Sequence, residues 1–438
     1  MTPAAARAAT HGAGLEDPVT GLVRRVFEVS ADPRDPEVAV VVAVLADITR
    51  YGDEEEAASD GSGAGLEVAT AYGAAVGECC ERYALATVQP ERFHVASWRE
   101  LPASSRPAAP SRWALFDAEQ HRRGLPFEPF TEDTRLAWIE ASHLAERRAV
   151  FVPACLVTVP YPARAEARAV APGISTGAAC ASSVEDALLG GLCELIERDT
   201  FMIAWRNRLP LPRVRVGDDH RLARVVAERF GRPHLDYAVF HTTLDLGVPS
   251  FFGLVRDRSR KPAAVVAGGA AHPDPARGYL KTLLEVTQGL RWLDNLRDLP
   301  EQRDERGGFD DIRSFEDRVR LYGFGGCDEA FAFLEDGAAE VSLGDIAPFP
   351  ADGRLGSIVE RLEACGVGAL AVDIAPADVR AAGLCVLKAL APELETMEGD
   401  HTMPFLGGER WRRVPVELGL RSTAPALDEL NPWPHPYP

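Results

Sequence analysis

The pattern of apolar positions alternates between two periods along the chain. Residues 37–48 and 236–255 are rich in aliphatic and β-branched side chains, which predicts strands. Three segments repeat their apolar residues every three or four positions, which predicts helices over 69–87, 184–205 and 275–296. Because strands and helices follow one another, the pattern indicates an α/β fold in which helices pack on mixed sheets.

Segments without such periodicity predict loops. Residues 52–65 are acidic and then rich in Gly and Ser, and residues 301–311 are charged and contain Gly, so both predict loops. The last eight residues, 431–438, place proline at every second position. This spacing excludes a helix or a central strand and predicts an extended, stiff tail.

The same features suggest a division of the chain. Residues 1–14, rich in Ala and Thr, predict a disordered lead-in. Residues 15–60 form an N-terminal segment that contains strands, and residues 61–438 form one large domain that ends in the proline-rich tail.

One short motif occurs twice. Glu78, Glu81 and Arg82 have the spacing ExxER, and Glu194, Glu197 and Arg198 repeat it. Positions i, i+3 and i+4 share one face of a helix, so each motif places two carboxylates beside a guanidinium. A solvated stripe of ion pairs is the ordinary reason for such spacing.

The neighbours of the second motif argue against a solvated stripe. Its face continues with Ala187, Gly190 and Gly191, and the opposite face is apolar from Leu188 to Met202. A helix that is buried on both sides must direct its charges toward partners, a metal or a ligand. Ser182 and Glu185 have the spacing of a capping box at its start.

A loop of small residues, 173–179, precedes this helix. Such loops expose backbone N–H groups and suit contact with phosphate, which makes Ser175 a candidate nucleotide contact. The loop also matches GxSxG, the nucleophile elbow of hydrolases, but Pro172 precedes it and the predicted helix begins late. A structural turn is the third interpretation.

The third predicted helix adds Glu285 and Gln288, again at i and i+3, with Arg291 nearby. Several carboxylates that converge cannot all ionise without a counter-charge, and Mg²⁺ prefers carboxylate and phosphate oxygens. The chain has no P-loop motif and no GxGxxG, which excludes the common nucleotide sites. The residues alone therefore predict an acidic, Mg²⁺-dependent site that is suited to a nucleotide.

Composition narrows the possible partners. The 438 residues carry a net charge of −19, which disfavours nucleic acid and anionic membranes. The longest strongly apolar run, 38–45, is too short to span a bilayer. None of the eight cysteines forms a CxxC motif, which predicts buried, reduced thiols in a cytoplasmic protein and argues against zinc.

Several stretches of the sequence together resemble the motifs of one known family. They include ISTGAACASSVEDALLGGLCELIERDTFMIAW, AYGAAVGECCERY and LKTLLEVTQGLRW. These three are similar to the central signature, the first glutamate helix and the ExxQ helix of the YcaO family. Further similarity lies in VDIAPADVRAAGLCVLKALAPELETM and PFLGGERW. The motifs follow one another in the family's order, from about residue 61 to the C-terminus, and imply a YcaO-type ATP-binding fold.

The resemblance implies roles for individual residues. Mg²⁺ would be bound by Glu78, Glu81, Glu194 and Glu197, and ATP by these residues together with Arg82, Arg198, Glu285, Gln288 and Ser175. NPWPHPYP looks like the terminus of azoline-forming members, in which the chain end lies near the active site, so Pro434, Pro436 and Pro438 are candidate catalytic residues; a disordered end is the alternative.

The chain also departs from the family pattern. It has Ser62-Gly63-Ala64-Gly65 where members often have Lys-Gly, and Ala74 where they often have serine. Losing a lysine and a hydroxyl would weaken nucleotide binding or move those contacts elsewhere. The complete Glu and Arg set argues against a degenerate, inactive paralogue.

The family reaction is ATP-dependent cyclodehydration of Cys, Ser or Thr in a ribosomal precursor peptide to thiazoline or oxazoline. The implied partners are the precursor peptide, a separate E1-like (ThiF-like) protein that binds the leader peptide, and a flavin-dependent dehydrogenase that acts later. Thioamide or amidine formation, a non-catalytic scaffold that binds nucleotide or peptide, and a serine hydrolase based on Ser175 are the alternatives.

Overall fold

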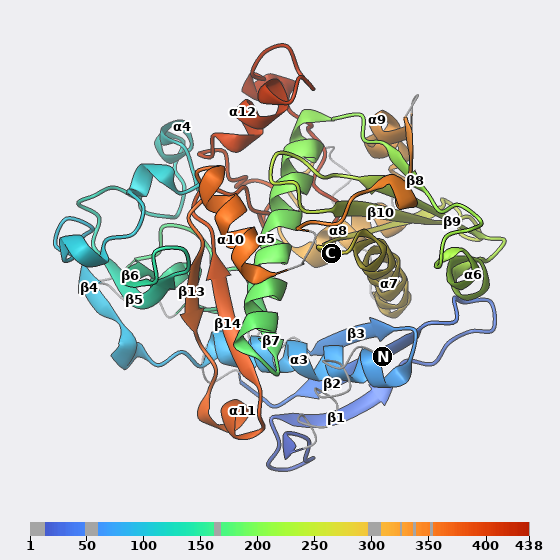
Figure 1. The fold of residues 1–438 in the computed structure, drawn as a ribbon, viewed down its shortest axis with the longest axis horizontal. Helices are drawn as coiled ribbons and strands as arrows, with labels where there is room; N and C mark the ends of the chain where they lie inside the picture. The colour runs from blue at the N-terminus through green and yellow to red at the C-terminus, as the bar shows by residue number, and fades with distance from the viewer. Residues whose placement is uncertain are drawn as a thin grey trace.

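The computed structural model describes residues 14–48, 60–161, 168–296, 308–324, 326–335, 339–350 and 354–437. Within these ranges the strands form three sheets, of three, five and six strands, arranged around a central helix, α5 (Val184–Asn207), which is drawn in green in Figure 1. This confirms the predicted α/β fold of mixed sheets with packed helices. The predicted lead-in, apart from Gly14, lies outside the described residues.

The N-terminal sheet is antiparallel and consists of β1 (Val23–Glu28), β2 (Ala39–Leu45) and β3 (Gly61–Gly65). Helix α3 (Val68–Ala86) packs on it, which confirms the helix predicted over 69–87. β2 lies within the strand predicted over 37–48.

The loop predicted over 52–65 is wrong at its end, because Gly61–Gly65 forms β3. A side chain at Gly63 would overlap the backbone of α3, so these glycines permit close packing of strand and helix. Composition alone does not separate this use of glycine from a loop. The other predicted loop, 301–311, is described only from residue 308, where the chain forms bends and turns.

The five-stranded sheet has the order β11 (Ala264–Ala271), β10 (Ser250–Asp257), β9 (Leu235–His241), β8 (Arg213–Arg215), β12 (Glu340–Ser342). The strand predicted over 236–255 is therefore two strands, β9 and β10, which pair antiparallel. Gly247, with φ +72°, and Pro249 interrupt the aliphatic run between them. Helix α7 (Pro275–Leu296), which has the predicted bounds, packs on β11 and β10.

The six-stranded sheet follows the order β4 (His94–Ala96), β5 (Leu136–His143), β13 (Leu370–Asp373), β14 (Cys385–Leu390), β7 (Ala178–Ala181), with β6 (Arg148–Pro153) paired to β5. Helix α5 packs on β14 and β7. Shorter helices complete the described fold: α4 (Ala118–Arg122), α6 (Ala223–Val225), α8 (Phe315–Phe324), α9 (Ala332–Glu335), α10 (Leu355–Ala364), α11 (Ala377–Ala381) and α12 (Arg410–Glu417).

Helix α5 is buried along most of its length, as predicted from its two apolar faces. A Cβ on Gly191 would approach the carbonyl oxygen of Gly177 to 2.5 Å, so the glycine allows the preceding loop to lie directly on the helix. The predicted cap is wrong by one position. The side chain of Ser183, not Ser182, accepts from the backbone N–H of Asp186, because the helix begins at Val184.

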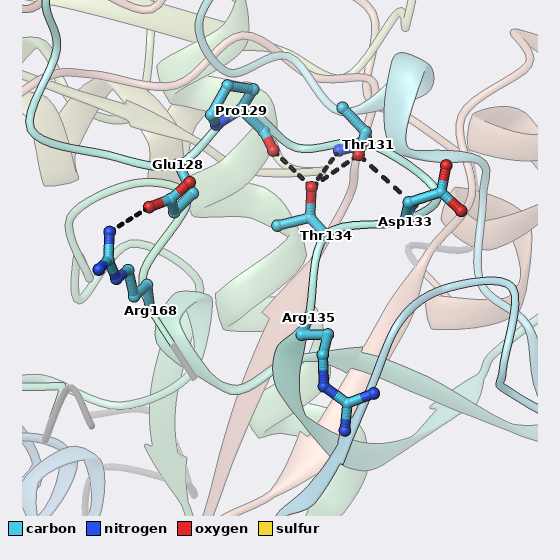
Figure 2. A pocket seen from close by; sticks show the side chains of 7 residues that line it. All are labelled: Glu128, Pro129, Thr131, Asp133, Thr134, Arg135 and Arg168. Carbon is cyan, nitrogen blue, oxygen red and sulfur yellow. Dashed lines mark hydrogen bonds and ion pairs between the residues drawn. The ribbon is translucent and has the colours of Figure 1, made fainter. Parts of the chain in front are cut away.

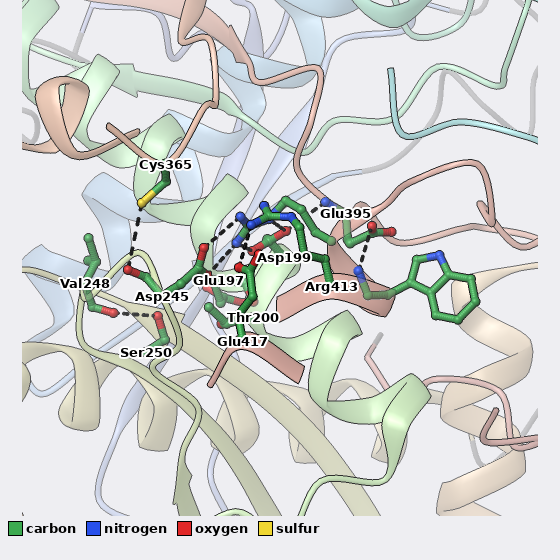
Figure 3. A network of polar contacts seen from close by, with 12 residues as sticks. Glu197, Asp199, Thr200, Asp245, Val248, Ser250, Cys365, Glu395, Arg413 and Glu417 are labelled. Atoms are coloured by element: carbon green, nitrogen blue, oxygen red, sulfur yellow. Dashed lines mark hydrogen bonds and ion pairs between the residues drawn. The ribbon is translucent and has the colours of Figure 1, made fainter. Parts of the chain in front are cut away.

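A buried ionic network joins α5 to the C-terminal part of the chain. The guanidinium of Arg410 donates two hydrogen bonds to Asp199, of 2.8 and 2.7 Å, and two to Asp245, of 2.9 and 2.7 Å. Asp199 is fully buried, and its carboxylate also accepts from the backbone N–H of Glu395 at 2.9 Å. Figure 3 shows Asp199, Asp245 and Glu395 around this network.

The proline-rich tail has no helix or strand over 431–437, as predicted, and residues 434–437 are buried against the rest of the molecule. Residue 438 lies outside the described residues. All eight cysteines are free thiols, five of them buried and three partly buried. No helix in the described ranges is long and apolar enough to cross a membrane.

Replacing Arg410 by Met should lower the free energy of unfolding by about 3–5 kcal/mol, because it leaves Asp199 charged and buried without its partner. Arg413→Met on the same helix is the matched control. Arg413 forms an exposed pair with Glu417, so its loss should change stability by about 1 kcal/mol or less. Chemical denaturation of both variants measures the difference, and equal midpoints would contradict the role given to Arg410.

Candidate functional site

The predicted glutamate, glutamine and arginine residues of the site lie on three helices, each of which packs on a different sheet. Glu78, Glu81 and Arg82 lie on α3, the second ExxER motif lies on α5, and Glu285 and Gln288 lie on α7. Figure 1 draws these helices toward the middle of the molecule, and the charge of Glu194 on α5 acts on Glu81 of α3, while that of Glu285 on α7 acts on Glu197 of α5. Their acidic side chains therefore come from separate stretches of chain and face a common region.

Glu78 is held by Ser62 and Arg82. One carboxylate oxygen accepts from the backbone N–H of Ser62 at 2.6 Å, and the other accepts from Arg82 at 2.7 Å. Gln288 donates from its amide to the hydroxyl of Ser62 at 2.6 Å. Ser62 on β3 therefore links the glutamate helix α3 to α7.

Glu194 is held in the same way. One oxygen accepts from the backbone N–H of Gly177 at 3.1 Å, and the other lies 3.5 Å from the guanidinium of Arg198. Gly177 has φ +87°, a conformation that favours glycine, and this turn aims its N–H at the helix. Arg198 also pairs with Glu197.

Glu285 repeats the arrangement a third time. It accepts from the backbone N–H of Gly269 on β11 at 3.2 Å, and its other oxygen lies 3.7 Å from the ammonium of Lys281. The backbone donor precedes its glutamate by 16, 17 and 16 residues for Glu78, Glu194 and Glu285. In each of the three cases, a strand or the loop before a strand supplies the backbone donor, and the helix that follows carries the glutamate back to it.

Two further glutamates lie deeper. The carboxylate of Glu81 accepts from the backbone N–H of Cys180 at 2.7 Å, and burial raises its pKa to about 8, with Glu78 and Glu194 adding repulsion. Burial also raises the pKa of Glu197, where Arg198 opposes the shift and Glu285 and Glu194 add to it. The site therefore holds more carboxylates than its own cations neutralise.

This excess of carboxylate fits a divalent cation. In the described ranges, no three Asp, Glu, His or Cys side chains form a preformed metal cage. Mg²⁺ commonly uses one or two carboxylates and fills its remaining positions with water and phosphate oxygens. Glu78, Glu194 and Glu285 are partly exposed, with 29%, 26% and 33% of their side-chain surface accessible, so a cation bound together with a nucleotide can reach them.

Sequence reasoning missed several residues of this region, among them Lys281, Lys388, Ser62 and Gly269. Lys281 stands one turn before Glu285, and the i,i+4 spacing could have identified it. Lys388 is buried in β14, where a lone lysine in an apolar strand was the available signal. Gly269 acts through its backbone N–H group, and Ser62 through its backbone N–H and its hydroxyl; a backbone N–H leaves no local signature in the sequence.

The loop that contains Ser175 packs against β14. Lys388 donates to the carbonyl oxygens of Ile174 and Thr176, at 2.5 and 2.6 Å, and burial lowers the pKa of this lysine to about 8. Ser175 itself is exposed. The hydrolase interpretation is wrong in its geometry, because a nucleophile elbow joins a strand to a helix, whereas here strand β7 follows the serine.

The tail reaches the site through Tyr437, whose ring centroid lies 4.8 Å from the guanidinium carbon of Arg198. Pro434 and Pro436 are buried next to it along the chain. Pro438 lies outside the described residues, and the catalytic role predicted for the three prolines stays a prediction.

Two surface hollows lie outside this group of glutamates. One has a volume of about 770 Å³ and is lined by Glu128, Pro129, Thr131, Asp133, Thr134, Arg135 and Arg168 (Figure 2). The other, of about 550 Å³, lies at the start of α7 and is bordered by Leu189 of α5. The first hollow has no residue from α3, α5 or α7, so its position does not link it to the site.

The chain is similar to several known proteins. A family model described as YcaO cyclodehydratase, ATP- and Mg²⁺-binding, matches residues 62–395. Two uncharacterized proteins are 29% identical to this chain: one from Methanothermobacter thermautotrophicus over 157 residues, and one from the tfuA 3′ region of Rhizobium leguminosarum bv. trifolii over 189 residues. The matches cover 35% and 40% of this chain, and the chain spans only 41% and 44% of these relatives.

Solved structures share the fold. A heterocyclase in complex with substrate and cofactor has a TM-score of 0.78 at 23% identity, over 99% of this chain and 57% of that chain. YcaO from Methanopyrus kandleri bound with AMPPCP and Mg²⁺ has a TM-score of 0.59 at 20% identity, over 85% and 86%. The E. coli microcin synthetase McbBCD complex with pro-MccB17 bound has a TM-score of 0.55 at 15% identity, over 86% and 90%.

The residues that match the family model run from Ser62 on β3 to Glu395 beyond β14 and include all three helices that carry the glutamates. The two ExxER motifs and the ExxQ motif lie within it, in the order in which the sequence presents them. On these matches, the chain belongs to the YcaO family.

Proposed function

We propose that the protein is an ATP- and Mg²⁺-dependent cyclodehydratase that converts Cys, Ser or Thr residues of a ribosomally made precursor peptide to thiazoline or oxazoline. Membership of the YcaO family supports this activity. The observation that carries the proposal is the meeting of three glutamates, each with a cation one helical turn away, in a region with excess carboxylate.

The positions of the glutamates support the roles that we propose for them. Glu78, Glu81, Glu194 and Glu197 would hold Mg²⁺, which supplies positive charge beside the phosphates and lowers the repulsion among these carboxylates. The raised pKa values of Glu81 and Glu197 support this assignment, because a bound cation would stabilise their charged forms. Their backbone and arginine contacts hold them in place beforehand.

Arg82, Arg198, Glu285, Gln288 and Ser175 would complete the nucleotide site. The guanidinium of Arg82, with 34% of its side chain accessible, is placed to contact phosphate oxygens. Gln288 fixes Ser62, which in turn fixes Glu78. Lys281, half exposed beside Glu285, offers a cation in a chain whose glycine-rich strand β3 carries no lysine.

The reaction begins when the thiol or hydroxyl of the substrate residue attacks the preceding amide carbonyl and loses its proton. The resulting oxyanion takes the γ-phosphoryl group of ATP, which releases ADP. Phosphate then leaves with the former amide oxygen as the ring C=N bond forms and the amide nitrogen loses its proton. Phosphorylation converts a poor leaving group into a good one, and Arg198 would stabilise the charge that develops during transfer.

We further propose a separate E1-like, ThiF-like partner that binds the leader peptide, and a flavin-dependent dehydrogenase that acts later. The fold is shared with a heterocyclase in complex with substrate and with a microcin synthetase complex with pro-MccB17 bound, which supports a peptide substrate and partner proteins. Because the cysteines are free thiols, we place the reaction in the reducing cytoplasm.

Reconstitution tests the proposed reaction. The protein, the E1-like partner, a precursor peptide and Mg-ATP should give a product that has lost one water per ring, as measured by intact-mass spectrometry. Replacement of oxygen by sulfur would instead indicate thioamide formation. An unchanged peptide without ATP hydrolysis would indicate a binding scaffold and would contradict the proposal.

Changing Glu194→Gln or Glu197→Gln should lower peptide-dependent ATP hydrolysis and ring formation by roughly 100-fold or more, because each change removes a carboxylate that faces the metal and phosphates. Glu185→Gln is the matched control, since Glu185 lies in the exposed first turn of the same helix. Steady-state phosphate release measures the effect. Equal rates for all three variants would exclude the assigned roles.

Changing Pro434 and Pro436 together to Ala should slow ring formation roughly 4- to 30-fold, because two fixed φ angles of the buried tail are released at about 0.4–1 kcal/mol each. The exposed Pro432→Ala serves as the control. Ring formation is followed by mass spectrometry under single-turnover conditions. A double variant that cyclises at the wild-type rate would exclude a role for these two prolines in the mechanism.

A further inference from the structure

The proline-rich tail is fixed to the molecule along its length. The backbone N–H of Asn431 donates to the carbonyl of Arg206 at 2.8 Å, and the indole of Trp205 donates to the carbonyl of Trp433 at 3.0 Å. The hydroxyl of Tyr322 donates to the carbonyl of Pro434 at 2.5 Å. The tail is therefore anchored to α5 and α8 before it reaches the glutamates.

The next residues continue this anchoring. His435 is 1% exposed, and its Nε2 lies 2.9 Å from the carbonyl oxygen of Glu398. Pro436 is also buried. Pro434 and Pro436, on either side of His435, each have a fixed φ. These contacts therefore leave Tyr437 one defined position.

Tyr437 fills an aromatic pocket between α5 and the five-stranded sheet. Its ring centroid lies 4.3 Å from that of Phe201 and 5.8 Å from that of Phe252, and the residue is 2% exposed. A Cβ on Gly269 would overlap the hydroxyl oxygen of Tyr437, so the glycine is needed to admit this side chain. Gly269 is also the residue whose N–H holds Glu285.

The ring of Tyr437 supports Arg198. The guanidinium carbon lies 4.8 Å from the ring centroid, within the range of a cation–π contact. At its nitrogens the same guanidinium pairs with Glu194 and Glu197. The two carboxylates fix where its nitrogens lie, and the ring limits the tilt of its plane.

We propose that Tyr437 is a positioning residue for Arg198, and that the tail acts on the site through this ring. The inference rests on the proposed function, in which Arg198 faces the transferred phosphoryl group, and deepens it by giving the tail a physical route to that arginine. It differs from a direct catalytic role of the tail prolines, because the ring acts only through Arg198.

Tyr437 could act on Arg198 through its aromatic ring or through its hydroxyl, and the surroundings of the hydroxyl bear on which group is needed. The hydroxyl is buried without a hydrogen bond of ordinary geometry, and the guanidinium of Arg198 is the cationic group beside it. A buried hydroxyl without such a bond contributes little to the stability of the fold, so its removal is not expected to impair folding. The ring, not the hydroxyl, is therefore the part that the inference requires.

Tyr437→Leu and Tyr437→Phe test the inference in the full chain with its partner, peptide and Mg-ATP. Tyr437→Leu should lower kcat roughly 2- to 30-fold with little change in KM for ATP, because the lost contact orients a group that acts on charge developing during transfer. Tyr437→Phe keeps the aromatic face and should restore kcat to within about twofold of wild type.

Phe27→Leu is the matched control, because Arg25 lies 4.7 Å above the ring of Phe27 on the exposed strand β1, where it does not concern the site. It should leave kcat and KM unchanged. A Tyr437→Leu enzyme with wild-type kcat, a loss confined to KM, or a Phe variant as slow as the Leu variant would overturn the inference.

A double-mutant cycle separates this inference from the proposed function. Tyr437→Leu and Arg198→Met should change the unfolding midpoint non-additively, because the two side chains are in contact. Additive shifts would overturn the contact even in an active enzyme. Absence of ATP hydrolysis in the wild-type protein with peptide and partner would instead overturn the proposed function, and the cycle would still decide the contact.

Discussion

The site depends on one repeated interaction: a glutamate on a helix, held between a backbone N–H from the preceding strand or loop and a cation one turn away. Glu78, Glu194 and Glu285 all have it. A carboxylate in the interior loses its hydration, and only such charge-assisted contacts offset that loss. Without them the three helices would bring together acidic side chains that repel one another.

The backbone donors require close packing of each strand or loop on its helix. Gly63 on β3, Gly191 on α5 and Gly268 on β11 make this possible. An added Cβ would lie 2.4 Å from the carbonyl oxygen of Ala71 at Gly63, 2.5 Å from that of Gly177 at Gly191, and 3.2 Å from the Cβ of Glu285 at Gly268. The donors are therefore backbone groups that the packing holds in place, not groups on mobile side chains. This gives the carboxylates fixed positions before any ligand arrives, which suits a site that stabilises developing charge.

Helix α5 connects the site to the rest of the fold through two consecutive residues. Arg198 faces the glutamates and the ring of Tyr437, while Asp199 faces Arg410 in the buried network. The segment around Arg410 and the tail thus both contact α5 within one turn of the second ExxER motif. A substitution in either of these C-terminal segments would therefore alter a direct contact of Arg198 or of its neighbour Asp199.

The sequence by itself determined the three glutamate helices, because the 3.6-residue period, the repeated ExxER spacing and small neighbouring residues are all local patterns. It misjudged β3, the break between β9 and β10, and the cap at Ser183, where glycine and serine serve packing or capping at positions that composition does not distinguish. The boundary predicted near residue 60 stays a prediction, although β1 and β2 share a sheet with β3.

Only the tertiary structure decided which groups complete the site. The donor to Glu81 comes from Cys180, 99 residues away, and the contacts of Lys388 and Tyr437 span comparable or larger separations. A backbone N–H is the same at almost every residue, and a tyrosine or lysine shows no sign of its distant partner. Periodicity reports the face that a helix buries, whereas the packing of the sheets selects the atoms that meet there.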